Sequence, residues 1–309
     1  MLVSAFPSTP CISSTPKPAL VLSPDRKDIS LLNYRDFVAR KNRQPLTVAH
    51  RGAWTTGPEN SLLAIRGAFD AGHQIVEIDI QESADGILFL MHDDTLERMT
   101  GETGAASDRT MAELASFRLR ERDGGSDSAA SDEPIPALAQ VLAQAEGRGF
   151  LDLDVKHPHL IEKVAETAAE LGAAARVNVK FPLRTAEDLA RLRHIEATTG
   201  VMVMPMLRLT VETWTDDVAR VLESGAVMTE MKFDSLDTLR AAAGQLNAGG
   251  TSVWVNTLDP VCSAGLSDSR AAHEPDAIWG VLVEAGVSVF QTDIPDLLSA
   301  WIKRQGVAA

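Results

Sequence analysis

The chain has 309 residues, of which 45% are hydrophobic and 23% charged, and its formal net charge is −14. This composition is typical of a globular protein with a large core, and the excess of acidic residues argues against a nucleic-acid partner and against attachment to an anionic lipid surface. The two cysteines, Cys11 and Cys262, provide neither a disulfide framework nor the spacing of a metal site. The sequence lacks an apolar run of about 18 residues, so it predicts no transmembrane helix.

The N-terminal segment differs from the rest of the chain. Residues 1–28 are rich in Ser and Pro and lack the basic start and continuous apolar stretch of a signal peptide. We expect them to form a flexible extension, and we expect a cytoplasmic location. The remainder, residues 29–309, fits either two average domains or one α/β barrel, which needs about 250 residues. The segment Ser30–Lys41 predicts a short helix before the first strand.

An acidic pair interrupts an otherwise apolar stretch from Ile75 to Ile80. Glu77 and Asp79 are two residues apart in this predicted strand, so their side chains point to the same face. Two carboxylates on one buried face repel each other and lose their hydration, and a divalent cation would offset both costs. A solvated pair at the end of a strand, or a pair neutralised by Arg or Lys, would also explain the pattern.

Short motifs surround this acidic strand in a fixed order. A strand, a loop and an amphipathic helix precede it, so the region predicts a βαβ unit. The ordered set HRG, PENS, E-x-D and HD resembles the glycerophosphodiester phosphodiesterase family. The residues that carry the resemblance are His50-Arg51-Gly52, Pro58-Glu59-Asn60-Ser61, Glu77-Ile78-Asp79 and His92-Asp93.

A long connection follows His92. Residues 93–135 exceed the length of a plain barrel connection, and they resemble a small insertion that this family carries after its second strand region. Within it, Arg109–Leu119 has helical periodicity, whereas residues 121–133 are polar and predict a loop.

Short apolar segments and helical segments alternate over the rest of the chain. Eight strands in a βα order, with polar residues at their trailing ends, favour a closed (β/α)8 TIM barrel whose active face lies at the C-terminal ends of the strands. The predicted strands are Leu46–Ala49, Ile75–Ile80, Phe150–Val155, Val177–Phe181, Val201–Pro205, Val227–Phe233, Ser252–Asn256 and Val287–Gln291. The predicted helices are Ser61–Ala71, Ala137–Gln144, Ile161–Leu171, Thr185–Thr198, Val211–Glu223, Ser235–Leu246 and Ala277–Glu284.

The third predicted strand places Asp152, Asp154 and Lys156 on one face. The resemblance implies that Asp154 completes a metal site, although the family usually has Glu at this position and enzymes resembling sphingomyelinase D have Asp. We expect Asp152 to pair with a neighbouring base. Lys156 either reaches a phosphate oxygen or forms an ion pair with Asp152 or Asp154.

Other polar residues at strand ends are weaker candidates. Glu230 and Lys232 are compatible with a structural pair or with a contact in the site. Trp254 either packs over a ligand, as the resemblance implies, or belongs to the core. Asp293, in the closing T-D-x-P motif, is expected to fix loop geometry. The histidines without a motif are expected at the surface or in loops: His73, His157, His159, His194 and His273.

The resemblance, which covers roughly residues 46–300, implies metal-dependent hydrolysis of glycerophosphodiesters to glycerol 3-phosphate and an alcohol such as choline or ethanolamine. Mg²⁺ or Ca²⁺ is the expected cofactor and a small-molecule phosphodiester the expected partner. The expected metal ligands are Glu77, Asp79 and Asp154, and the expected substrate-binding residues are Arg51, Asn60, Lys156 and Trp254.

Two histidines are the expected proton-transfer groups. We predict His50 as the general base and His92 as the general acid, and the reverse assignment is equally compatible with the sequence. A lysophospholipase D-like or sphingomyelinase D-like enzyme would use the same residues on a lipid. A barrel that binds phosphodiesters without hydrolysing them is a third alternative.

Overall fold

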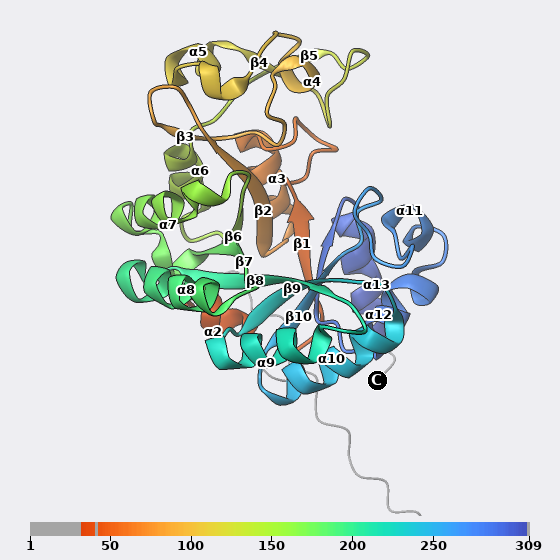
Figure 1. Ribbon diagram of the computed structural model, residues 1–309. Helices are drawn as coiled ribbons and strands as arrows, with labels where there is room; N and C mark the ends of the chain where they lie inside the picture. Colours follow the sequence, from red (N-terminus) through yellow and green to blue (C-terminus); the bar gives the residue numbers. More distant parts are fainter. Residues whose placement is uncertain (1–31, 41–42, 308–309) are drawn as a thin grey trace, which may run out of the picture.

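The computed structural model describes residues 32–40 and 43–307 (Figure 1). The expected extension, residues 1–28, lies outside the described residues. The strands are β1 (Leu46–His50), β2 (Ile75–Glu82), β3 (Leu88–Leu90), β4 (Arg118–Arg120), β5 (Ala130–Pro134), β6 (Phe150–Val155), β7 (Val177–Pro182), β8 (Met202–Leu209), β9 (Met228–Phe233), β10 (Ser252–Asn256) and β11 (Val289–Thr292).

Helices separate most of these strands in the chain. The α-helices are α2 (Tyr34–Val38), α3 (Leu62–Ala71), α4 (Glu97–Thr100), α5 (Met111–Ser116), α6 (Leu138–Ala145), α7 (Ile161–Glu170), α8 (Ala186–Thr199), α9 (Trp214–Ser224), α10 (Leu236–Ala248), α11 (Asp268–Ala271), α12 (Val281–Glu284) and α13 (Pro295–Val307). Shorter helical turns are η1 (Ala106–Asp108), η2 (Pro158–Leu160), η3 (Ala174–Arg176) and the π-helical η4 (Asp276–Gly280).

Eight parallel strands close into a barrel in the order β1, β2, β6, β7, β8, β9, β10, β11. The closure depends on β1, which pairs with β11 through Leu46 and Val289 and with β2 through His50 and Glu77. The outward side chains of the strands pack against the surrounding helices and form the largest hydrophobic cluster. The predicted (β/α)8 barrel is therefore confirmed.

A second cluster fills the N-terminal end of the barrel. Helix α2 presents Tyr34 and Phe37 to Phe150, the first residue of β6, and both ring pairs have centroids 4.8 Å apart. Trp254 belongs to the same cluster, and all four aromatic side chains are fully buried. The segment expected to form a helix from Ser30 to Lys41 thus folds, within the described residues, as a shorter helix that closes this end.

The insertion after β3 is a small layered unit above the C-terminal end of the barrel (Figure 1). It has its own core, made of Phe89, Met91, Leu96, Met99, Ala106, Leu114, Leu119 and Ile135. The expected helix Arg109–Leu119 is too long, because Thr110 and Glu113 cap α5 at its start and β4 begins at Arg118. The expected loop at residues 121–133 contains β5, which pairs with β4 in an antiparallel hairpin.

The C-terminal helix α13 was not predicted. Its residues Leu298, Trp301 and Ile302 are buried against the barrel. His73 lies in a loop, one of its two predicted locations, but it is buried there: its residue is 5% exposed, and its Nε2 lies 2.9 Å from Asp296 Oδ1 at the start of α13. Every helix in the described part of the chain is too short or too polar to cross a membrane.

Candidate active site

The three carboxylates predicted to bind a metal converge at the C-terminal ends of β2 and β6. Asp79 and Asp154 are register partners on these neighbouring strands, and Glu77 lies two residues before Asp79 on the same face. Carboxylate oxygens of all three residues lie within 4.8 Å of one another. Glu77 and Asp79 are each 1% exposed, so water screens their charges little.

The protonation of the acidic pair is uneven. Burial raises the pKa of Glu77 well above its usual value, and the neighbouring Asp79 raises it further. Burial also acts to raise the pKa of Asp79, but Lys156 and Arg51 outweigh this effect and lower it far below its usual value. The residues present fit a divalent cation, because all donors are carboxylate oxygens and Glu77 has too little positive charge nearby to ionise readily.

Arg51 lies in a turn that only certain residues tolerate. Its φ is 56° and that of Gly52 is 90°. A Cβ atom at Gly52 would lie 2.7 Å from the carbonyl carbon of Ala64, so glycine is required there. The turn directs Arg51 into the site, where Nε lies 3.0 Å from Asp79 Oδ2 and Nη1 lies 2.8 Å from Glu59 Oε2.

Asn60, which the sequence predicts to bind substrate, contacts Asp79. Its residue is 2% exposed, and its side chain forms two hydrogen bonds with Asp79: Nδ2 donates to Oδ2 at 2.8 Å, and Oδ1 accepts from the backbone N–H at 3.0 Å. The next residue, Ser61, caps α3 by accepting a hydrogen bond from Ala64 N. Asn60 therefore orients Asp79 from behind, and it does not face the cavity.

Each of the two predicted catalytic histidines contacts a carboxylate through the same ring nitrogen. His50 Nδ1 lies 2.6 Å from Asp293 Oδ1, and His92 Nδ1 lies 2.7 Å from Asp93 Oδ1. A carboxylate at Nδ1 favours the proton on that nitrogen and leaves Nε2 for proton exchange. Asp293, which was expected to fix loop geometry, thus orients a catalytic candidate, a contact that the sequence did not indicate.

The environments of the two histidines differ. The His50 side chain is 12% exposed and that of His92 39%. Burial lowers the pKa of His50 and outweighs the hydrogen bond to Asp293, so its imidazole is neutral at pH 7. Beside His92, two hydrogen bonds from Arg98 lower the pKa of Asp93 to about 2, so that carboxylate stays charged.

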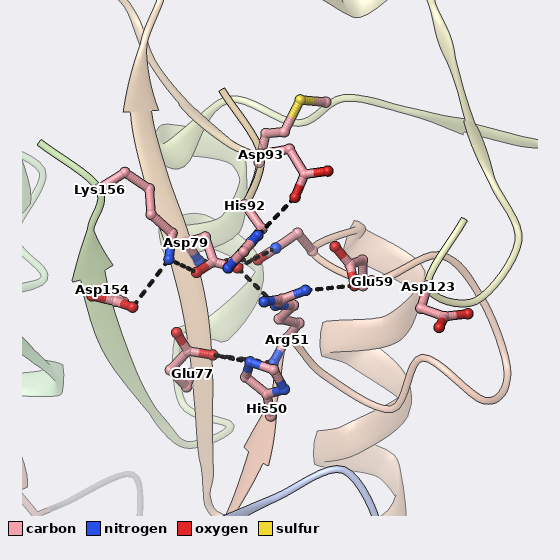
Figure 2. A network of polar contacts seen from close by, with 12 residues as sticks. His50, Arg51, Glu59, Glu77, Asp79, His92, Asp93, Asp123, Asp154 and Lys156 are labelled. Atoms are coloured by element: carbon pink, nitrogen blue, oxygen red, sulfur yellow. Dashed lines mark hydrogen bonds and ion pairs between the residues drawn. The ribbon is translucent and has the colours of Figure 1, made fainter. Parts of the chain in front are cut away.

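Lys156 forms ion pairs inside the site (Figure 2). Its Nζ lies 2.7 Å from Asp79 Oδ1 and 3.2 Å from Asp154 Oδ2. Of the two ion-pair partners predicted from the sequence, Lys156 contacts Asp154 and does not contact Asp152. Lys156 also lines the cavity together with Arg51, so both bases face a bound ligand.

A buried lysine below the site was missed by the sequence analysis. Lys180 Nζ lies 3.0 Å from Glu230 Oε2, 3.4 Å from Asp152 Oδ2 and 3.1 Å from Gln291 Oε1. It is therefore the base expected beside Asp152, and it gives Glu230 a structural partner. A polar pair two residues apart in an apolar strand, Asn178 and Lys180, was the signal in the sequence.

Trp254 belongs to the core, which is one of the two alternatives that the sequence left open for this residue. The residue is fully buried and does not line the cavity. Its Nε1 donates to Asn256 Oδ1 at 2.6 Å, and Asn256 Nδ2 donates to Glu230 Oε1 at 3.0 Å. Because the indole is packed on all sides inside the barrel, it acts as core and positions Asn256.

A cavity of about 750 Å³ opens at the mouth of the barrel. One side carries the residues described above, including His50, His92, Asp154 and Lys156. The opposite side is formed by residues at the ends of β7, β8 and β9 and in the loop after β10. These include Arg184, Met206, Arg208, Lys232, Leu258 and Val261.

Comparisons with known proteins agree with this geometry. A family model described as the glycerophosphoryl diester phosphodiesterase family matches residues 50–181, and a second model, described as a domain of unknown function, matches residues 203–302. The human protein glycerophosphodiester phosphodiesterase 1 is 35% identical over 144 residues, which cover 44% of this chain and 39% of that protein. The chain therefore spans less than half the length of this relative.

Solved structures share the fold over most of the chain. A glycerophosphoryl diester phosphodiesterase from Parabacteroides distasonis superposes with a TM-score of 0.71 at 23% identity and covers 89% of this chain and 93% of its own. A phosphodiesterase from Oleispira antarctica, solved with the product sn-glycerol-3-phosphate, has a TM-score of 0.60 at 20% identity and covers 86% and 98%. At these identities the similarity concerns the barrel fold.

Proposed function

We propose that the chain hydrolyses glycerophosphodiesters to sn-glycerol 3-phosphate and an alcohol with the aid of Mg²⁺ or Ca²⁺, as its match to the glycerophosphoryl diester phosphodiesterase family over residues 50–181 supports. One observation carries the proposal: a cluster of three carboxylates, two of which line the cavity, lies beside two carboxylate-bound histidines and two bases at the same cavity. The name of the human relative and the product bound to the Oleispira protein support the same reaction class.

Glu77, Asp79 and Asp154 would hold the cation, which neutralises oxygens of the phosphodiester and the charge that develops on them. Arg51 and Lys156 are already ionised and oriented by Asp79. From these positions they bind non-bridging phosphate oxygens and stabilise the transition state, Arg51 through a guanidinium that can form paired hydrogen bonds.

His50 and His92 divide the two proton transfers. His50 is neutral at pH 7, and its Nε2 accepts the proton of the nucleophile. His92 donates a proton to the departing alkoxide, and the charged Asp93 at its Nδ1 stabilises the protonated ring that exists before the transfer. Each group typically contributes about 10²–10⁴-fold to the rate.

A lipid substrate is the main alternative reaction. The apolar side chains of the insertion pack into its own core, and nothing in its described residues favours contact with a membrane. Comparing the turnover of glycerophosphocholine with that of lysophosphatidylcholine separates the two reactions. We expect the water-soluble diester to be the better substrate, and faster turnover of the lipid would reverse the assignment.

Chelation is the first test of the proposed function. The protein is treated with EDTA and assayed for free sn-glycerol 3-phosphate after Mg²⁺, Ca²⁺ or Mn²⁺ is restored, over a set of glycerophosphodiesters. We expect activity to vanish with EDTA and to return with a divalent ion. No hydrolysis of any diester with any of the three ions would instead support a barrel that only binds phosphodiesters.

A further inference from the structure

Three basic residues stand at one level of the barrel mouth, opposite the carboxylates. Arg208 on β8 and Lys232 on β9 are register partners, so their side chains lie side by side on the cavity face. Pro182, the last residue of β7, is the partner of Met206, and Arg184 follows Pro182 by two residues as Arg208 follows Met206. All three bases line the cavity.

These charges are only weakly compensated: the charge of Arg184 helps to lower the pKa of Asp188, but the two side chains form no ion pair. In residues 32–40 and 43–307, the side chains of Arg184 and Lys232 form neither an ion pair nor a hydrogen bond. Arg208 has one partner, Asp234 at 3.3 Å, but the two side chains are 71% and 59% exposed, so the pair contributes little. Asp217 also lines the cavity here, and its charge is matched by Arg220 at 3.1 Å.

Lys180, which lies deeper in the barrel on β7, differs from these three bases in its burial and ion pairs. Lys180 is 3% exposed and lies between the carboxylates of Glu230 and Asp152. Its charge is therefore neutralised by ion pairs within the protein. On this side of the mouth, the three bases at the rim are therefore the ones that can contact a ligand.

The cavity wall also disfavours a cationic head group. Quaternary ammonium groups are usually held by the faces of aromatic rings. The described residues that line this cavity include no Phe, Tyr or Trp. A choline group on this side would meet three bases, whereas an anion would gain favourable contacts with each of them.

We propose that the alcohol portion of the substrate carries a phosphate group, which Arg184, Arg208 and Lys232 bind while the scissile diester lies at Asp79 and Arg51. This inference rests on the proposed hydrolysis of glycerophosphodiesters. The glycerol portion has only hydroxyl groups, so the second anion belongs to the alcohol. The volume of about 750 Å³ leaves room for both groups. The products are sn-glycerol 3-phosphate and a phosphorylated alcohol.

A matched pair of substrates tests this preference. Glycerophosphoglycerol and its terminally phosphorylated form differ only in the second phosphate. We expect kcat/KM to be about tenfold higher for the phosphorylated form at low salt, and this ratio to fall toward one as NaCl screens the contact. Hydrolysis of both substrates with a ratio of one at low salt overturns the phosphate site but leaves the proposed function standing. No hydrolysis of either overturns both.

Variants then locate the phosphate site. The double variant R208Q/K232M removes two charges from the rim, and we expect the ratio to fall to about two or less. Arg184→Gln, alone, should lower it by about threefold. The control is Arg240→Gln on the outer helix α10, which removes a charge of the same sign away from the cavity and should keep the wild-type ratio. An unchanged ratio in both rim variants would place the preference elsewhere and refute the assignment.

Discussion

The two sides of the barrel mouth use charge in opposite ways. On the side of β1, β2 and β6, each base is already paired with a carboxylate: Arg51 with Asp79 and Glu59, and Lys156 with Asp79 and Asp154. On the side of β7, β8 and β9, the bases at the rim extend into the cavity with weak partners or none. The first side is preorganised for chemistry, and the second is left adjustable for recognition.

The family comparison divides the chain at nearly the same place. The phosphodiesterase family model ends at residue 181, within β7, and the model of unknown function begins at residue 203, within β8. The paired side of the mouth thus lies in the segment that the phosphodiesterase family model matches. The unpaired side is built mostly by residues of the second segment.

The largest expected effect of a single substitution is at Asp79. Asp79→Asn keeps the shape of the side chain but removes the charge that holds Arg51, Lys156 and the cation together. We expect kcat/KM to fall about a thousandfold, or about 4 kcal/mol, with weaker metal affinity measured by titration of the activity. Circular dichroism should show the fold retained.

The matched control for that variant is Asp94→Asn. Asp94 is 74% exposed in its side chain and lies outside the carboxylate cluster, so activity and metal dependence should stay near wild type. If Asp79→Asn kept the metal dependence of the wild type, the paired side of the mouth would not be a metal site.

The next effect separates the roles of the two histidines. Alanine at His50 or His92 should lower the rate on an alkyl diester by about a hundredfold or more. On a p-nitrophenyl phosphodiester, whose phenolate leaves without protonation, His92→Ala should recover most of the loss and His50→Ala should not. Rescue of His50→Ala alone would reverse the assignment, and His159→Ala, at an exposed position, controls for the loss of an imidazole.

A smaller effect is expected at Asp293, which orients His50. Asp293→Asn should lower kcat/KM about tenfold, because the proton on Nδ1 loses its charged acceptor. The pKa of His50 is below 6.5 in the wild type, and Asp293 acts to raise it. Removing that charge lowers the pKa further, so the acidic limb of the pH–rate profile should move to lower pH. A limb that moves to higher pH would contradict this contact.

The smallest effect is expected for the conservative change of Asp154 to Glu, the residue that the resemblance implies at this position. Asp154→Glu adds one methylene at a half-buried position and should keep activity within about threefold, with a changed preference between Mg²⁺ and Ca²⁺. Asp154→Ala should be nearly inactive. Wild-type turnover of Asp154→Ala at low metal concentration would move the third ligand to Asp152 or Glu59.

The sequence predicted what depends on local pattern. Alternation along β2 places Glu77 and Asp79 on one face, and the βα repeat places Asp154 on a neighbouring strand at the same level. Contacts between distant strands were harder to predict. The pairing of His50 with Asp293 and of Lys180 with Glu230 arises only when the barrel closes and sets the register.

The same reason explains why the contacts of Trp254 and Asn60 were hard to predict. Trp254 and Asn60 have the residue types expected at a ligand site, but their depth in the barrel decides what they contact. The β4–β5 hairpin was missed because Ala130–Pro134 is polar and lacks the apolar alternation of a buried strand. Its pairing with β4 is a tertiary contact that no local pattern encodes.

The helix that closes the N-terminal end of the barrel blocks access of ligands to the cavity from that end. Tyr34 and Phe37 of α2 fill that end against Phe150, so the reaction chamber communicates with solvent at the strand ends that carry the site. In the described part of the chain, the mouth at these strand ends is the opening of the cavity, and we expect reactants and products to pass through it. A product that stays at the carboxylates therefore obstructs the next substrate, and accumulated sn-glycerol 3-phosphate should act as a competitive inhibitor. The alcohol, held nearer the rim, leaves first.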